Sequence, residues 1–151
     1  MLKKFLRFFF IDEVLREDIA FLKKVPLFRE LSDRSLAKVA LIIFKKTYLA
    51  GEKIYENNNE ANVVYLVKSG QVNLLCGNIN KVVEEEGFFG ETSLIENAKR
   101  TCLATVLKDS ELYLIYRAKF EDMVESNGKI GLIIMKNLAS MFAARLKCSE
   151  V

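Results

Sequence analysis

The sequence predicts an α+β fold in which short antiparallel strands form a roll between helices at both ends of the chain. Apolar residues recur every three or four positions at the two ends. The middle instead has short runs rich in Val, Ile, Tyr and Leu that are separated by turn residues. Of 151 residues, 51% are hydrophobic and 28% are charged, which excludes a disordered or low-complexity chain. One compact folded unit is therefore expected.

Two helical segments are expected before the first strand. The apolar positions on one side of the first are Phe8, Ile11, Leu15, Ile19 and Leu22. This spacing favours an amphipathic helix, or a broken pair of helices, from Leu2 to Leu22. Pro26 ends the segment, and a second helix is expected after Ser32, whose side chain can cap the free amide groups. We assign residues 1–25 to an N-terminal helical segment and residues 26–151 to the main domain.

The middle of the chain predicts two tight hairpins. Val63–Val67 and Gln71–Leu75 flank Lys68–Ser69–Gly70, and Thr101–Leu107 is followed by Leu112–Tyr116 after Asp109 and Ser110. Strands at such close spacing indicate a roll or barrel.

Helical spacing returns near the C-terminus. One helix is expected from Ala118 to Glu125, and the last helix carries an apolar stripe of Ile130, Ile134, Leu138, Met141 and Leu146. Asn127 and Gly128 separate the two helices and are expected to act as a hinge.

The composition excludes several kinds of chemistry. The chain has no histidine, which is the usual general base near neutral pH and the commonest metal ligand. We therefore expect no catalytic residues, no metal site and no enzyme activity. A cupin-type jelly-roll enzyme is the best competing architecture, but such enzymes generally hold a metal with histidines. The 23 basic and 20 acidic residues are interspersed, so no nucleic-acid surface is expected.

The cysteines and the N-terminal residues indicate the cellular compartment in which the protein is expected. Cys76, Cys102 and Cys148 are odd in number and far apart, so we expect buried, reduced thiols in a cytoplasmic protein rather than a metal or iron–sulfur site. Charged residues interrupt the apolar run of Met1–Asp12 well short of a signal peptide or a membrane span.

The most informative segment is Gly87-Phe88-Phe89-Gly90-Glu91-Thr92-Ser93-Leu94, with Arg100 nine residues after Glu91. A glycine allows the backbone to approach a ligand closely, and a short helical turn over Glu91–Ile95 would direct free amides at an anion. Arg100 would add a guanidinium to the same anion. Glu91 can accept a hydrogen bond from a sugar hydroxyl. Together these groups suit a nucleotide monophosphate. In the structural alternative, Glu91 caps a helix and pairs with Arg100 as a bridge.

This segment resembles the phosphate-binding cassette of the cyclic nucleotide-binding domain family, which occurs in catabolite-activator-type regulators, kinase regulatory subunits and gated channels. Gly51–Ile54 and Tyr65–Val72 resemble an early strand and the central hairpin of the same family, and the resemblance runs from Phe21 to Leu146. It implies an antiparallel, jelly-roll-like β-roll, or double-stranded β-helix, with N-terminal helices, a short cassette helix and a C-terminal lid helix.

The resemblance also implies roles for individual residues. Glu91 and the backbone of Gly90 would bind the ribose 2′-hydroxyl. The amides of Thr92 and Ser93 would help to hold the cyclic phosphate, and Arg100 would pair with its charge.

Further roles concern the base. Thr101 matches a position that carries threonine in several cGMP-responsive members, which favours cGMP slightly over cAMP. Leu74, Val83 and Phe89 fall where the family lines the sugar and base with apolar side chains.

The chain departs from the family pattern at a few positions. Asn58, Ala61 and Glu86 stand where glycines are usual, and Lys99 replaces a proline or small residue. The chain ends at Val151 without the helix-turn-helix of DNA-binding members, so we expect a stand-alone module that does not bind nucleic acid directly.

The expected function is a sensor that binds cAMP or cGMP, requires no other cofactor, and moves its last helix on binding. A homodimer or a partner protein is expected to use the terminal helices. One alternative is a degenerate, non-binding roll that serves dimerisation or scaffolding, and another is the sensor half of a truncated transcription regulator. The N-terminal segment contains a cluster of aromatic and basic residues, which we expect to pack on the roll or on a partner chain. A helix that lies on a membrane surface is the less favoured alternative. The members of the cluster are Lys3, Lys4, Phe5, Arg7, Phe8, Phe9 and Phe10.

Overall fold

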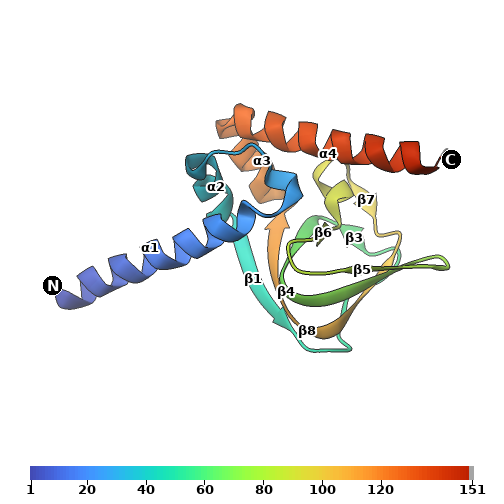
Figure 1. Ribbon diagram of the computed structural model, residues 1–151, viewed down its shortest axis with the longest axis horizontal. Coiled ribbons are helices and arrows are strands. Elements are labelled where there is room, and N and C mark those ends of the chain that lie inside the picture. The colour runs from blue at the N-terminus through green and yellow to red at the C-terminus, as the bar shows by residue number, and fades with distance from the viewer. Residues whose placement is uncertain (150–151) are drawn as a thin grey trace.

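The computed structural model describes residues 1–149, and the side chains of residues 3–11 lie outside that description. An antiparallel sheet lies between helices at the two ends of the chain, so the predicted α+β roll is confirmed (Figure 1). The expected packing of the aromatic and basic N-terminal cluster concerns side chains that the structure does not describe. Within the described part, no helix is both long and apolar enough to cross a membrane.

The N-terminal helices follow the predicted order. The first, α1 (Leu2–Leu22), is unbroken and projects away from the roll in Figure 1. A 3-10 turn, η1 (Pro26–Phe28), begins at the proline and leads to α2 (Asp33–Ala40). The Ser32 hydroxyl accepts a hydrogen bond from the Ser35 amide at 3.3 Å, which confirms the predicted cap.

Eight strands make up the sheets of the described residues. They are β1 (Ile43–Tyr48), β2 (Lys53–Tyr55), β3 (Glu60–Ala61), β4 (Val63–Cys76), β5 (Ile79–Val83), β6 (Phe88–Phe89), β7 (Ala98–Lys99) and β8 (Leu103–Tyr116). The larger sheet has the order β1-β8-β4-β5, with β2 also paired to β8 and β6 to β4. Strands β3 and β7 form a separate pair, which joins the segment before β4 to the segment after the cassette turn.

The two predicted hairpins are wrong. Each is one continuous strand of 14 residues, and the two strands, β4 and β8, pair with each other. The supposed turns are irregularities that face each other across the ladder, where the register shifts between Val67 and Val72. Gly70 has φ +95°, and a Cβ there would collide with Ser110. Glycine inside a strand permits such a bulge, so its turn-like sequence marks a bend of the roll rather than a chain reversal.

The C-terminal helices cover one end of the roll. Helix α3 (Arg117–Ser126) and helix α4 (Gly128–Ser149) are separated by Asn127, as the sequence predicts. In Figure 1, α4 runs across the roll above the cassette turn η2 (Glu91–Leu94). Ile134 and Leu138 of α4 are fully enclosed in a core shared with α2 and η1, whereas Leu146 is exposed. The far end of α4 therefore extends beyond the core that anchors it.

Candidate functional site

A cavity of about 240 Å³ lies where η2, the roll and α4 meet. The described residues that line it are Tyr55, Leu74, Cys76, Lys81, Phe88, Phe89, Gly90, Glu91, Thr92, Lys99, Arg100, Thr101, Cys102 and Arg145. The structure thus brings together seven of the residues that the sequence singled out. They are Leu74, Phe89, Gly90, Glu91, Thr92, Arg100 and Thr101.

The other two candidate residues, Ser93 and Val83, lie away from this lining. Ser93 is a fully buried residue of the cassette turn itself, and its hydroxyl donates to the Gly90 carbonyl at 2.7 Å. Val83 lies opposite Val72 in the core of the roll and lines a neighbouring cavity of about 270 Å³. Arg145 lines both cavities, so it stands between them.

Gly90 fixes the entrance to the cassette turn. Its φ is +77°, in the left-handed region that disfavours other residues. A Cβ here would come within 2.5 Å of an Arg100 guanidinium nitrogen and 3.0 Å of the Val63 carbonyl oxygen. Only glycine therefore fits the backbone and leaves room for the arginine beneath it.

Arg100 is the central cation of the site, and only 5% of it is exposed. Its Nη2 donates to the Val63 carbonyl at 2.6 Å, and its Nη1 lies 3.4 Å from the Gly90 carbonyl. The guanidinium stacks on Tyr55, 4.3 Å from the ring centroid. Its buried Nε has no hydrogen-bond partner among the residues that the structure describes. Such an unpartnered donor costs about 1–3 kcal/mol, which an anion in the cavity could recover.

The two tyrosines near Arg100 do not neutralise its charge. Burial raises the pKa of Tyr55 to about 12, although the Arg100 guanidinium opposes the rise. Burial likewise raises the pKa of Tyr65 to about 12, with Arg100 again opposing. Both rings are therefore uncharged near neutral pH, and they present a polarisable face to a cation that lacks an acidic partner within the described part of the chain.

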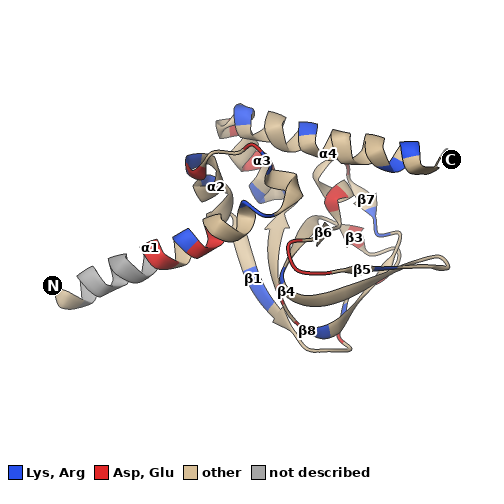
Figure 2. Cartoon of the chain, in the orientation of Figure 1, with Lys and Arg blue, Asp and Glu red and all other residues tan. Residues whose placement is uncertain are grey.

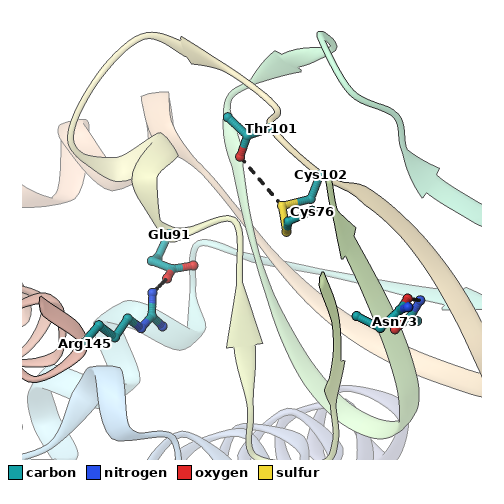
Figure 3. The surroundings of a disulfide bond; sticks show 7 residues. Asn73, Cys76, Glu91, Thr101, Cys102 and Arg145 are labelled. Carbon is teal, nitrogen blue, oxygen red and sulfur yellow. Dashed lines mark hydrogen bonds and ion pairs between the residues drawn. A yellow bond between two sulfur atoms is a disulfide. The ribbon is translucent and has the colours of Figure 1, made fainter. Parts of the chain in front are cut away.

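Glu91 has a partner that the sequence analysis missed. The carboxylate, on a residue only 8% exposed, accepts a hydrogen bond from Arg145 Nη1 of α4 at 2.7 Å (Figure 3). The structural alternative of a bridge between Glu91 and Arg100 is therefore not what the structure shows. The pair instead ties the cassette to the exposed end of α4.

The cysteine prediction is wrong for all three residues. Cys76 and Cys102 form a disulfide, and Cys148 is exposed rather than buried. The two bonded residues are 26 positions apart, so their spacing alone gave no signal. Pairing of Leu75 with Leu103 in the β4–β8 ladder places the next residues, Cys76 and Cys102, opposite each other. Knowledge of the strand register, which the hairpin interpretation missed, was needed to find the bond.

The lining also contains charges that motif reasoning did not find. Four described lining residues are basic, namely Lys81, Lys99, Arg100 and Arg145, whereas Glu91 is the one acidic residue among them. In Figure 2, the η2 turn lies below α4, which carries basic positions along its length. This balance favours an anionic ligand. The resemblance places the last helix over the base of the ligand, and this was the one signal in the sequence that Arg145 of that helix lines the site.

A comparison with known proteins decides the family. Residues 45–127, more than half of the chain, match a family model described as cyclic nucleotide-binding domain. The chain belongs to the cyclic nucleotide-binding domain family. The match includes the cassette turn, Arg100 and every described lining residue of the cavity except Arg145.

Individual relatives agree with this assignment. The cyclic AMP receptor protein of Thermus thermophilus is 28% identical over 136 residues, which cover 86% of this chain and 61% of the relative. The cAMP-dependent protein kinase regulatory subunit of Candida albicans is 26% identical over 118 residues, covering 76% of this chain and 25% of the relative. A protein of known structure from Geobacter metallireducens GS-15 is 31% identical, with a TM-score of 0.69, covering 80% of this chain and 91% of that one. The chain thus spans 61% or less of the two curated relatives.

Proposed function

We propose that this chain is a regulatory sensor that binds cAMP or cGMP in the cavity between η2, the roll and α4. The observation that carries the proposal is the buried guanidinium of Arg100, which lies beside the left-handed Gly90 and whose Nε is unpartnered among the described residues. A cyclic phosphate would accept that hydrogen bond and supply the missing negative charge. The names of the Thermus and Candida relatives, both of which refer to cAMP, support the same ligand class.

The cassette would hold the rest of the ligand. In this proposal the amide of Thr92 assists Arg100 at the phosphate, and Glu91 accepts from the ribose 2′-hydroxyl. The Ser93 amide, which the resemblance also assigned to the phosphate, donates to the Gly90 carbonyl at 3.2 Å and is not free for a ligand. Leu74 and Phe89 supply apolar surface along the cavity. Thr101 also lines the cavity, and its hydroxyl gives cGMP a slight preference. The sensor needs no further cofactor and performs no catalysis.

Binding would be coupled to α4 through Glu91. The ribose hydroxyl and the Arg145 guanidinium compete for the same carboxylate, since Arg145 holds it at 2.7 Å. Release of Arg145 would free the end of α4 that lies beyond the core, and the helix would reposition about Asn127 and Gly128. The ligand drives this change only to the extent that it binds the moved state more tightly.

The terminal helices are the surfaces where a second copy or a partner protein would detect the change. Helix α1 projects from the roll (Figure 1), and Leu132 and Leu146 of α4 are exposed. We expect sedimentation velocity to show a change in self-association when a cyclic nucleotide is added. If the chain stays monomeric with and without nucleotide, the change in α4 would have to be recognised by a different protein.

A scaffolding role is the second candidate, and one observation favours it. Because Arg145 already occupies the Glu91 carboxylate, a roll that no longer binds a ligand would keep this contact as a permanent brace. Such a domain would join other proteins through its terminal helices without responding to a nucleotide.

Thermal unfolding with added nucleotides separates the two candidates. At a hundred times its Kd, a ligand stabilises the folded state by about 2.7 kcal/mol. For a domain of this size that is a rise in Tm of roughly 5–10 °C. We expect this rise with cAMP or cGMP and little change with 5′-AMP, whose phosphate is not closed into a ring. No rise with either cyclic nucleotide would favour the scaffold.

A further inference from the structure

The disulfide between Cys76 and Cys102 is part of the cavity wall. Both residues line the cavity and both are partly exposed, so the disulfide is not enclosed in the core. Figure 3 shows the bond beside Thr101, and Glu91 belongs to the lining of the same cavity. The disulfide therefore lies within the proposed binding site rather than in a remote structural position.

The disulfide fixes the chain directly after Arg100. Cys102 immediately precedes β8, and its bond to Cys76 extends the β4–β8 pairing beyond Leu75 and Leu103. The intervening Thr101 has its Oγ1 3.7 Å from Cys102 Sγ. Arg100 and Cys102 are two positions apart, so a restraint on the second limits where the first can lie.

On its other side, the backbone of Arg100 is held by the loop before β3. The Arg100 amide donates to the Asn59 carbonyl at 2.8 Å, and the Asn58 amide donates to the Arg100 carbonyl at 2.8 Å. Asn58 has φ +68°, in the region that asparagine tolerates better than most residues. The segment that carries the phosphate-binding guanidinium is thus held by a hydrogen-bonded loop on one side and a covalent bond on the other.

We propose that the Cys76–Cys102 disulfide is a redox modification site at which a dithiol lowers the affinity for cyclic nucleotide. A thiolate of the dithiol attacks one sulfur, the S–S bond breaks, and a mixed disulfide forms. That attack releases the other cysteine as a thiolate. The second thiol of the reagent then attacks the reagent's own sulfur in the mixed disulfide and displaces the remaining cysteine, so the dithiol is oxidised to a disulfide and both cysteines end as thiols. The two electrons and two protons come from the dithiol.

The direction follows from preorganisation. The oxidised form holds Arg100 in place before the ligand arrives, whereas the reduced form must order that segment on binding. We expect reduction to weaken binding about five-fold or more, within the usual range of coupling between sites. This inference rests on the proposed function, because its readout is cyclic nucleotide affinity.

The experiment uses the full chain with Cys148→Ser, which removes the exposed free thiol without touching the cavity. The oxidised protein and the protein reduced with dithiothreitol are each titrated with cAMP and cGMP by calorimetry. Mass spectrometry after maleimide labelling counts the free thiols in each sample. The proposal predicts weaker binding only in the sample with two labelled thiols.

Variants keep the test decisive if reduction also loosens the fold. Two double variants lack the disulfide, namely Cys76→Ser/Cys102→Ser and Cys76→Val/Cys102→Val. Both should bind cyclic nucleotide as weakly as the reduced protein, and dithiothreitol should not change their affinity. Circular dichroism checks that both variants fold. Reciprocity gives a second measurement, because cyclic nucleotide should shift the dithiol–disulfide equilibrium by the same factor. Equal affinity in the verified oxidised and reduced forms overturns the inference and leaves the proposed function standing. No binding in either form overturns both.

Discussion

Two charged groups are equally buried in this molecule, and they differ in how their polar atoms are satisfied. Asp18 of α1 and Arg100 before β8 are each 5% exposed. The Asp18 carboxylate accepts from the Tyr113 hydroxyl at 2.7 Å and pairs with Lys45 Nζ at 2.8 Å. Arg100 bonds two backbone carbonyls, but its Nε is unpartnered within residues 1–149.

Under the proposed function, this difference in hydrogen bonding distinguishes a structural charge, Asp18, from a ligand-binding one, Arg100. A buried charge whose bonds are complete stabilises its surroundings and has nothing left to offer a ligand. A buried charge with an unused donor beside a cavity costs the free protein stability, which a ligand of opposite charge can restore. Burial alone would not have distinguished Asp18 from Arg100.

The largest expected effect is the loss of binding when Arg100 is removed. Arg100→Ala should weaken cyclic nucleotide binding by about 2–5 kcal/mol, because a desolvated charge pair is broken. Titration calorimetry measures this change. Arg34→Ala is the matched control, since it removes the same charge from an exposed site on α2 and should leave affinity unchanged.

Arg100→Lys guards against a folding defect in the alanine variant. Lysine keeps the charge but loses the guanidinium fork and its Nε donor, so binding should weaken although the domain folds. Wild-type affinity in this variant would show that a point charge suffices and that the unpartnered Nε is irrelevant.

The next largest effect is expected at Asp18, the buried charge whose contacts lie within the protein. Asp18→Asn removes the charge opposite Lys45, so we expect the free energy of unfolding in urea to fall by roughly 1–2 kcal/mol. Cyclic nucleotide affinity should stay within two-fold of wild type. A loss of affinity as large as the loss of stability would mean that the two buried charges are not independent.

A smaller effect is expected at the pair between cassette and helix. Glu91→Gln should weaken binding about tenfold, or about 1.4 kcal/mol, because the ribose loses a charged acceptor. Arg145→Gln should instead tighten binding by up to about five-fold. Arg145 is half exposed, so its pair with Glu91 contributes at most about 1 kcal/mol, and its removal frees the carboxylate. Weaker binding in Arg145→Gln would mean that the arginine contacts the ligand rather than competing with it.

The smallest effect concerns alkaline pH. Because the pKa of Tyr55 is raised by burial from 10.0 to about 12 in the folded state, the unfolded chain loses this proton first as pH rises. Stability should therefore be intact below pH 10 and decline between pH 10 and about 12. Urea unfolding at several pH values should show a shallower decline for Tyr55→Phe. Parallel curves for the two proteins would contradict the buried, neutral tyrosine.

The sequence predicted the helices well because their spacing is local. Pro26, the Ser32 cap and the break at Asn127 each act within one turn of chain, and each lies where expected. The hairpins failed because a glycine in a turn and a glycine at a bulge look alike in sequence. Only the pairing of β4 with β8 shows that Gly70 bends a strand.

In the candidate site, too, the residues close together in sequence were predicted and the contacts between distant residues were not. Gly90, Glu91 and Arg100 lie on one short segment with a recognisable spacing, and the structure brings all three to the cavity. Arg145 and the Cys76–Cys102 bond were missed, because both join residues that meet only in the folded chain. Glu86, which stands where the resemblance expects glycine, has φ +68°, in the left-handed region that glycine favours.

The central claim is tested most directly by watching the Arg100 Nε proton. Nuclear magnetic resonance of protein labelled with ¹⁵N at arginine Nε gives a separate signal for this group, which Arg100→Lys identifies by its loss. A new bond to phosphate should move the signal downfield and slow its exchange with water when cAMP or cGMP is added, and 5′-AMP should leave it unchanged. A signal that stays in place at saturating cyclic nucleotide would contradict the proposed role of Arg100.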